Sequence, residues 1–259
     1  YFGGLRGIGL YCRKHATDVN GFVLGGRSVG PWLTAFAYGT SYFSAGVFVG
    51  YAGQFGWKYG IAATWAGIGN AIIGSLLAWV VLGRRTRIMS QHLDSATMPQ
   101  YFGKRFGSNP LKIGASVIIF IFLIPYTASL YNGLSRLFGM AFNIDYSVCI
   151  IIMATLTAIY VIAGGYMATA INDFIQGIIM LFGIVAVIAA VIHSKGGFMS
   201  ALQGLANVSD PAVSDTPGIF ASFFGPDPFN LLCVVILTSL GTWGLPQMVQ
   251  KFYAIKDEK

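Results

Sequence analysis

A cluster of hydroxyl side chains interrupts an otherwise apolar segment near the start of the sequence. Gly39 and Gly46 bracket its four hydroxyl-bearing residues, which are Thr40, Ser41, Tyr42 and Ser44. Glycine weakens a helix interior by about 1 kcal/mol relative to alanine, and serine and threonine compete for backbone hydrogen bonds. A helix that breaks here inside a membrane exposes carbonyl oxygens, which are tolerated only where they face a cavity or an ion. The alternative is a helix-packing face built on Gly46 and Gly50.

A second interruption lies in the last apolar segment, residues 229–252. This segment holds two glycines and a proline, Gly241, Gly244 and Pro246, together with three hydroxyl side chains. Because proline removes a backbone hydrogen bond and kinks a helix, we expect the segment to break here. The alternative is an ordinary proline kink that neighbouring helices repair.

Titratable side chains are almost absent from the apolar segments. Of the nine acidic residues only Asp173 falls inside one, and the three histidines lie in loops or at a segment end. The sequence holds no zinc or iron cluster and no nucleophile beside a base, so an enzyme is not expected. Proton coupling would need a titratable group in mid-membrane. Asp173 is expected about one turn into its helix, where the helix N-terminus stabilises its charge, and this favours sodium over protons.

The composition indicates that a membrane positions these groups. The chain has 259 residues, of which 55% are hydrophobic and 10% charged, and its mean hydropathy is +0.68. Soluble domains carry about 25% charged residues, so a water-soluble globule is excluded. Nucleic-acid binding is not expected either, because the sixteen Lys and Arg behind the net charge of +7 lie between apolar runs rather than on one face.

Six apolar segments are each long enough to cross a bilayer as a helix, which needs about 20 residues. They cover residues 31–54, 60–82, 111–133, 145–164, 170–193 and 229–252. Residues 1–11 are too few to cross and are expected to be the end of a further helix, so we expect the chain to be a piece of a longer protein. The sequence therefore predicts an all-α, multi-pass protein of the cell (plasma or inner) membrane.

The basic residues indicate how these segments are oriented. If residues 12–30 are cytoplasmic and the sides alternate, thirteen of the sixteen Lys and Arg fall inside and three outside. This distribution is the one that the positive-inside rule describes. Residues 83–110 are then also cytoplasmic, as is the tail that begins at Lys251, and residues 194–228 are external.

The two interrupted segments stand at matching positions of the chain. Five segments run from residue 31 to residue 193, so the sixth begins a second group with the opposite orientation. A pair of interrupted helices at corresponding positions of two inverted halves points to the binding site of a transporter.

Several motifs, taken in order, resemble the sodium:solute symporter family, with proline and pantothenate symporters the most similar in style. They are Gly25–Trp32, Ser41–Ser44 with Gly50, Thr97–Phe102 with Arg105 and Phe106, Ala163–Tyr166 with Asn172–Gln176, and Trp243 and Gly244 near Pro246. The resemblance covers essentially the whole chain. It implies a LeuT-type fold of five plus five helices in inverted repeat, of which this chain holds the first repeat and the first helix of the second.

The resemblance also implies a division of the chain and an activity. Residues 1–30 would be the end of an extra N-terminal helix and a cytoplasmic linker, and residues 31–193 the first five-helix repeat. Residues 194–228 would be an extracellular loop, and residues 229–259 the first, broken helix of the second repeat with a cytoplasmic tail. The implied activity is sodium-coupled import of a small organic solute, such as an amino acid or a carboxylate, by alternating access.

Individual residues receive roles from the same resemblance. The backbone carbonyls of Thr40 and Phe43 are implied as Na⁺ ligands, and Asp173 as a waypoint on the route by which Na⁺ leaves. Substrate contact is implied for Ser41, Ser44, Thr64, Trp65, Ser239, Thr242 and Trp243. The solute stays open, because the chain has Tyr42 where proline symporters carry an acidic residue and Thr242 where sugar symporters carry an aromatic gate.

Two other functions are compatible with a polytopic membrane chain. A transporter-like sensor module of a signalling protein would share these features, and a histidine-kinase core elsewhere in the protein would distinguish it. A passive channel would need a ring of charges or a repeated carbonyl filter, and neither is visible. The expected partners are the solute, Na⁺ and membrane lipid, with no nucleic acid, and the sequence does not define an oligomeric state.

Overall fold

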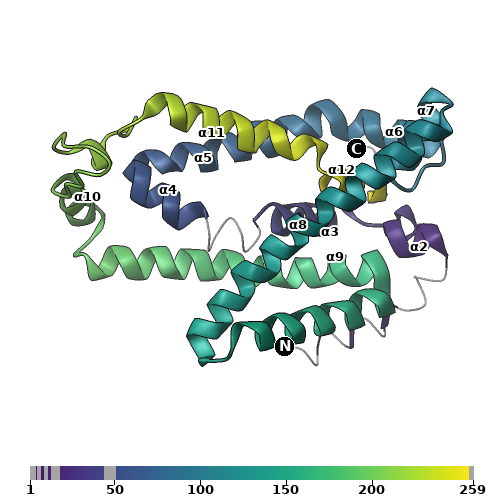
Figure 1. The fold of residues 1–259 in the computed structure, drawn as a ribbon, viewed down its shortest axis with the longest axis horizontal. Helices are drawn as coiled ribbons and strands as arrows, with labels where there is room; N and C mark the ends of the chain where they lie inside the picture. Colours follow the sequence, from purple (N-terminus) through teal and green to yellow (C-terminus); the bar gives the residue numbers. More distant parts are fainter. Residues whose placement is uncertain (1–3, 5–6, 9–10, 13–17, 44–50, 257–259) are drawn as a thin grey trace. The chain divides into compact units, whose positions relative to one another are not determined.

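The computed structural model describes residues 18–43 and 51–256, together with residues 4, 7–8 and 11–12 (Figure 1). Its regular elements are helices, and the α-helices are α2 (Val19–Leu24), α3 (Pro31–Tyr42), α4 (Ala52–Tyr59), α5 (Thr64–Gly69), α6 (Arg84–His92), α7 (Met98–Phe106), α8 (Asn109–Phe142), α9 (Tyr146–Ser194), α10 (Phe198–Ala206), α11 (Pro228–Gly241) and α12 (Pro246–Ala254). Shorter 3-10 or π-helical stretches join them at η2 (Gly25–Arg27), η4 (Gly60–Ala63), η5 (Asn70–Leu77), η6 (Trp79–Gly83), η7 (Ile219–Ala221) and η8 (Thr242–Gly244).

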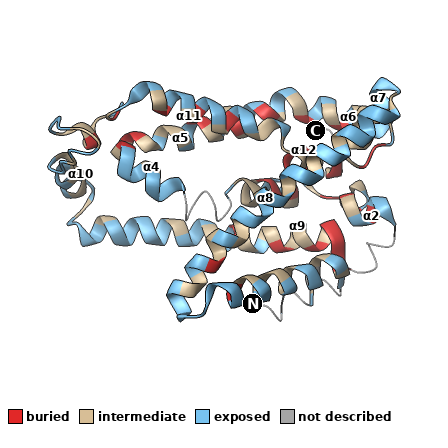
Figure 2. Ribbon diagram, viewed as in Figure 1, coloured by how far each residue is buried: buried red, intermediate tan, exposed pale blue. Residues whose placement is uncertain are grey.

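Within the described residues, three helices are long and apolar enough to cross a membrane: Ala52–His92, α8, and Val161–Ser194 within α9. A fourth is obtained when Pro228–Gly244 and Pro246–Ala254 are counted as one broken span. Ser135 is the only buried residue of α8, whose apolar side chains are otherwise exposed or half-buried (Figure 2). Exposed apolar side chains suit a lipid environment. A helix also suits it, because the backbone N–H and C=O groups are hydrogen-bonded within the helix. The chain is an all-α, multi-pass membrane protein.

Most of the predicted segments coincide with helices of the structure. Residues 60–82 and 111–133 fall inside the first two long helices, and residues 229–252 inside the broken pair. Helix α9 covers residues 170–193 and all but the first residue of 145–164, and the chain kinks between them at Gly165, where φ is 56° and ψ is −148°. Only a residue without a side chain adopts this conformation readily. The stretch Tyr146–Ile159 is shorter than a membrane span, so a full span over 145–164 is not found in the part of the chain that the structure describes.

The segment predicted at residues 31–54 is described only in part. It matches α3 as far as Tyr42 and the start of α4, and its residues 44–50 lie outside the described residues.

The chain divides into two compact units. Unit 1 comprises Tyr1–Gly46, Val80–Gly177 and Gly244–Lys259, and unit 2 comprises Val47–Trp79 and Ile178–Trp243. These units follow contacts within the chain rather than the order of repeats. The four-part division implied by the resemblance therefore stays a prediction.

In unit 1, two arginines hold together the segments that the sequence places in the cytoplasm. Arg27 donates to Ser90 Oγ at 3.2 Å and to Ser95 O at 2.8 Å, and Arg87 Nε donates to Ile255 O at 2.6 Å. Burial lowers the pKa of Arg27, and the nearby charge of Arg87 lowers this pKa further. These contacts put the three segments on one face of unit 1, and the assignment of that face to the cytoplasm stays a prediction.

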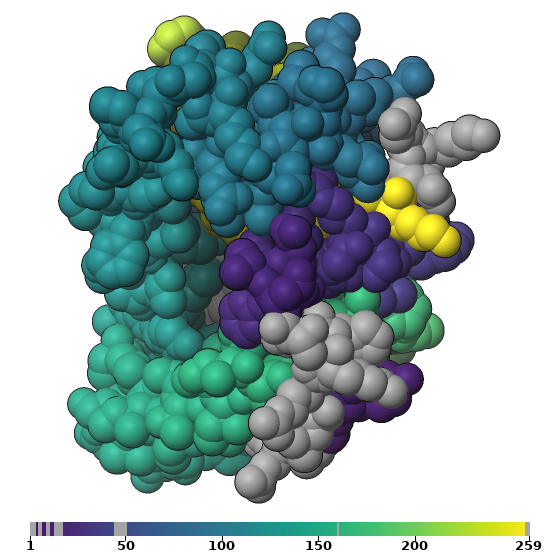
Figure 3. Space-filling view, turned by 90° about the vertical axis from the view of Figure 1, so that its right-hand side faces the viewer, coloured from purple at the N-terminus to yellow at the C-terminus, as the bar shows by residue number. Residues whose placement is uncertain are grey.

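The end of α12 also meets the start of α3 through the backbone. Val29 and Ile255 form an isolated parallel bridge, and the N–H of Lys256 donates to Val29 O at 3.0 Å. In Figure 3 the yellow residues near the C-terminus lie beside purple residues of the N-terminal part of the chain. The broken last helix is therefore anchored at its far end.

Unit 2 has a small core of its own. Tyr59 and Ala62 pack there against Leu231 and Val235 of α11, which lies alongside α5 (Figure 1). Gly60 has a positive φ of 60°, and a Cβ at this position would overlap the backbone of Phe220. This close approach ties the loop before α11 to the start of η4.

Candidate functional site

Helix α3 ends inside a predicted membrane segment. Pro31 suits its first turn, because the first N–H groups of a helix have no partner within it, and the helix then runs to Tyr42. Phe43 leaves the helical region with φ −87° and ψ 63°, while its N–H still donates to Gly39 O at 2.9 Å. The predicted interruption therefore begins within the described residues. Ser44, one of the predicted substrate contacts, lies outside them.

The two hydroxyl groups before this end bond back to their own helix. Thr40 Oγ1 donates to Phe36 O at 2.9 Å, and Ser41 Oγ donates to Ala37 O at 2.7 Å. Such bonds compete with the backbone ladder and bend helices, which agrees with a helix that stops one residue later. Each hydroxyl oxygen keeps its lone pairs, and a cation needs acceptors of this kind.

Helix α9 approaches this end of α3 closely. The rings of Phe36 and Phe174 meet edge to face with their centroids 4.8 Å apart. At Gly177, one turn after Asp173, an added Cβ would lie 2.5 Å from Phe36 Cδ1 and 3.2 Å from Thr40 Cγ2. The absence of a side chain at this glycine lets the two helices touch.

Asp173 faces two other helices from this stretch of α9. Its Oδ2 atom is 3.7 Å from Nζ of Lys251 on α12. The Thr40 side chain lies near the same carboxylate, while its hydroxyl proton is donated to Phe36 O. The structure thus places two residues of the predicted sodium route, Thr40 and Asp173, next to each other. The third, Phe43, follows at the end of α3 with its side chain 44% exposed.

The partner of Asp173 differs from the one expected from the sequence. Asp173 lies about two turns beyond the kink at Gly165, whereas the field of a helix N-terminus falls off within the first turn. That expectation was wrong, and Lys251 supplies the stabilising charge instead. The side chain of Lys251 is 8% exposed and its Nζ lies 4.9 Å from the centre of the Tyr166 ring.

The second predicted interruption is present at the end of α11. The α-helix stops at Gly241, the turn η8 follows, and Leu245 is extended with φ −68° and ψ 126° before Pro246 starts α12. Thr242 Oγ1 donates to Ser239 O at 2.8 Å. The segment is therefore a broken helix, as its glycines and proline predict.

In unit 2 this end of α11 packs against η5 through polar groups. Trp243 Nε1 donates to Ile73 O at 2.9 Å, and Asn70 Nδ2 donates to Thr238 Oγ1 at 3.0 Å. Ser239 is fully buried, and its hydroxyl has no hydrogen-bond partner among the described residues. A buried hydroxyl without a partner is costly unless something else bonds to it.

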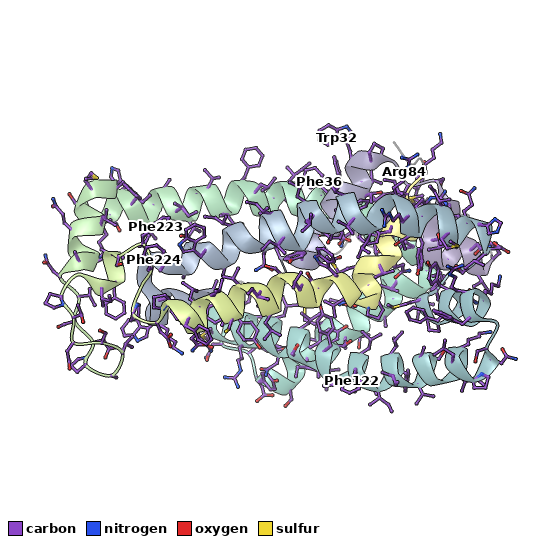
Figure 4. All side chains as sticks on the ribbon, turned by 90° about the horizontal axis from the view of Figure 1, so that it is seen from above. Trp32, Phe36, Arg84, Phe122, Phe223 and Phe224 are labelled. Carbon is purple, nitrogen blue, oxygen red and sulfur yellow. The ribbon has the colours of Figure 1, made fainter. Side chains whose placement is uncertain are left out.

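Thr64 and Trp65 belong to a different part of unit 2. Thr64 Oγ1 bonds back to Ile61 O at 2.8 Å, and Trp65 Nε1 donates to Phe223 O at 3.0 Å. The Trp65 and Phe223 rings also meet edge to face with centroids 4.8 Å apart, and Figure 4 labels Phe223 beside Phe224 in the loop before α11. Of these two predicted substrate contacts, Thr64 is thus engaged by η4 and Trp65 by this loop.

Three polar residues of these regions were not predicted from the sequence to belong to a site. The charge of Lys251 predicted that it belongs to the cytoplasmic tail. In the structure it lies on α12, four residues after Gln247 and on the same face of that helix. Both amide atoms of Gln247 are buried and lack a partner among the described residues. Asn70 was missed because its partner Thr238 is 168 positions away. The helical spacing of Gln247 and Lys251 was the one signal available.

Comparison with known proteins identifies what the chain is similar to. A family model described as "Sodium:solute symporter family" matches residues 22–259. The osmoregulated proline transporter OpuE of Bacillus subtilis (strain 168) is 32% identical over 262 residues, which cover 100% of this chain and 51% of that protein. Sodium/proline symporters of Staphylococcus aureus, from strains JH9 and COL, are 33% identical over 273 residues and are covered to 49%. The chain spans about half the length of these relatives.

Proposed function

The chain belongs to the sodium:solute symporter family, and from that premise we propose that it acts within a sodium-coupled symporter that imports a small organic solute by alternating access. The relatives carry proline in their names, so an amino acid is the solute class that we propose first and a carboxylate the second. The family is one of transporters rather than enzymes.

The observation that carries this proposal is the meeting of Thr40 and Asp173 where α3 breaks off. Na⁺ is a hard cation that prefers oxygen ligands. We assign the backbone carbonyls of Thr40 and Phe43 to the bound ion, and the Asp173 carboxylate to the route by which it leaves. One Na⁺ crossing a potential of 100 mV releases about 2.3 kcal/mol, which suffices for roughly fifty-fold accumulation of a solute.

The proposed solute contacts lie at the ends of the two broken helices. Ser41, followed by Ser44, stands at the end of α3. Ser239, Thr242 and Trp243 stand at the end of α11, where the buried hydroxyl of Ser239 is ready to bond a polar solute group. Thr64 and Trp65 are kept as proposed contacts on α5, and the ring contact of Trp65 with Phe223 suits a cover over the solute.

We also propose how the protein lies in the cell membrane. Residues 12–30 and 83–110 would face the cytoplasm, and membrane lipid would surround exposed helices such as α8. The contacts of Arg27 with Ser90 and Ser95 support a shared side for the two loops.

Solute counterflow in proteoliposomes that contain the full-length protein tests this function. Uptake of proline, a monocarboxylate, pantothenate and a sugar would be compared with an inward Na⁺ gradient and with choline in its place. We expect uptake of one of the first two solutes that requires Na⁺. Proton-driven uptake that is indifferent to Na⁺ would show that the proposed coupling is wrong.

A further inference from the structure

The ion pair between Asp173 and Lys251 brings a fixed positive charge to the carboxylate that we assign to the sodium route. The two charged atoms are 3.7 Å apart, and the side chains of Lys251 and Asp173 are 8% and 21% exposed. Because a buried ammonium without a counter-ion is strongly disfavoured, the lysine is held at this carboxylate whenever nothing else neutralises the pair.

We propose that the ammonium group of Lys251 acts as a tethered cation that occupies the Asp173 carboxylate when Na⁺ is absent and that passing Na⁺ must displace. The proposal rests on the proposed function, since it needs Na⁺ to reach Asp173. It makes Lys251 a positioning residue for ion release, because the returning lysine closes the carboxylate behind the departing ion.

Two groups near Lys251, an aromatic ring and an amide oxygen, are available to its ammonium when Na⁺ takes the carboxylate. The face of the Tyr166 ring is 4.9 Å from the lysine nitrogen and attracts a cation through its quadrupole. One turn before Lys251 on the same face of α12, Gln247 has a buried amide oxygen without a partner among the described residues. A lysine has a flexible four-carbon stem and a compact charge, so it can change partners without moving its helix.

The ion pair between Lys251 and Asp173 connects α9 to α12, the helix that follows the second interruption. Lys251 lies near the end of α12, whose next residues Phe252 and Ile255 contact α3 and the segment before it. Phe252 stacks against Tyr38 of α3 with ring centroids 6.1 Å apart. Release of the lysine from Asp173 therefore removes one of the contacts that hold α12 in place within unit 1.

Two substitutions of Lys251 with opposite expected effects test the proposal in the full-length protein. Lys251→Met removes the competing charge, so the half-saturating Na⁺ concentration should fall by about threefold or more. Lys251→Arg presents a forked guanidinium that holds a carboxylate more firmly than an ammonium, so the same concentration should rise by about threefold or more. The readouts are solute uptake and the Na⁺-dependent rise of the thermal unfolding midpoint.

Lys256→Met is the matched control, because Lys256 is an exposed cation near the same end of α12, and it should leave both readouts unchanged. Equal half-saturation for wild type, Lys251→Met and Lys251→Arg would overturn the proposal while leaving sodium coupling intact. A higher half-saturating concentration in Lys251→Met would overturn it as well. If the Lys251→Met protein does not accumulate in the membrane, the half-saturating Na⁺ concentration of Lys251→Arg alone tests the proposal. A wild-type protein that ignores Na⁺ would instead disprove the proposed function.

Discussion

Gly177 of α9 lies so close to Phe36 of α3 that an added Cβ would be 2.5 Å from Phe36 Cδ1. The same Cβ would be 3.2 Å from Thr40 Cγ2, on the residue whose carbonyl we assign to Na⁺. The distance between Thr40 and the carboxylate of Asp173 therefore depends on a glycine one turn further along α9. The contact at Gly177 therefore affects both the packing of α3 on α9 and the proposed ion site.

Gly177→Ala should separate the two helices, because the new methyl group would overlap the Phe36 ring and press against Thr40 Cγ2. We expect a loss of about 1–3 kcal/mol in stability, as for other overpacked contacts, and a higher half-saturating Na⁺ concentration. Thermal unfolding and Na⁺ titration of uptake measure the two effects. Gly183→Ala is the control on the same helix, since a Cβ there meets nothing within 4 Å. Equal behaviour of the two variants would refute the tight contact.

Asp173→Asn should weaken the response to Na⁺, because an amide oxygen replaces a charged ligand. Hydrogen bonds and contacts to charged groups are worth about 1.5–3 kcal/mol, which corresponds to a half-saturating Na⁺ concentration raised about tenfold or more. The variant should also be less stable, because Lys251 loses its counter-ion. Asp173→Glu keeps the charge and should retain most of the response. Unchanged Na⁺ dependence of Asp173→Asn would take this residue out of the sodium route.

Ser239→Ala should weaken solute binding without lowering the stability of the protein. The Ser239 hydroxyl is buried without a partner among the described residues, so its removal should leave the thermal midpoint unchanged or higher. If the hydroxyl bonds the solute, KM should rise about fivefold. Thr238→Val is the neighbouring control, which loses the bond with Asn70 and should lower stability while KM stays constant. A Ser239→Ala variant with normal KM would contradict the proposed contact.

Arg27→Ala should loosen the face of unit 1 on which the predicted cytoplasmic segments meet. It leaves Ser95 O without the 2.8 Å bond from the guanidinium, and an unsatisfied buried group of this kind costs about 1–3 kcal/mol. A lower midpoint in thermal unfolding of the purified protein is the expected result. Arg85→Ala removes an exposed arginine nearby and should be neutral. Equal midpoints would show that the Arg27 bonds do not stabilise this face.

The breaks in the helices were predictable because glycine, hydroxyl and proline residues act locally. The glycines around Thr40 and Ser41 predicted an interruption, and α3 ends at Tyr42. Pro246 and the glycines before it predicted the break that follows Gly241. The apolar segments were equally plain, since a helix that crosses a membrane needs a long run of apolar residues.

The partners of the polar groups were not predictable from one sequence. Asn70 and Thr238 pair across 168 positions, and no local pattern reports such a contact. Lys251 lies at the very end of the last apolar segment and was therefore predicted to be a cytoplasmic charge, although it is buried against Asp173. The meeting of α3, α9 and α12 is a product of tertiary packing, which decides where an isolated charge finds its counter-ion.

Binding of radioactive Na⁺ to the purified full-length protein tests the central claim most directly, because it needs neither solute nor transport. We predict saturable binding to the wild type that unlabelled Na⁺ displaces and K⁺ does not. Binding should be weakened in Asp173→Asn and in Gly177→Ala, whose new methyl group presses against Thr40, while Lys256→Met binds normally. If both site variants retain wild-type affinity, the broken end of α3 and the carboxylate beside it do not hold the ion.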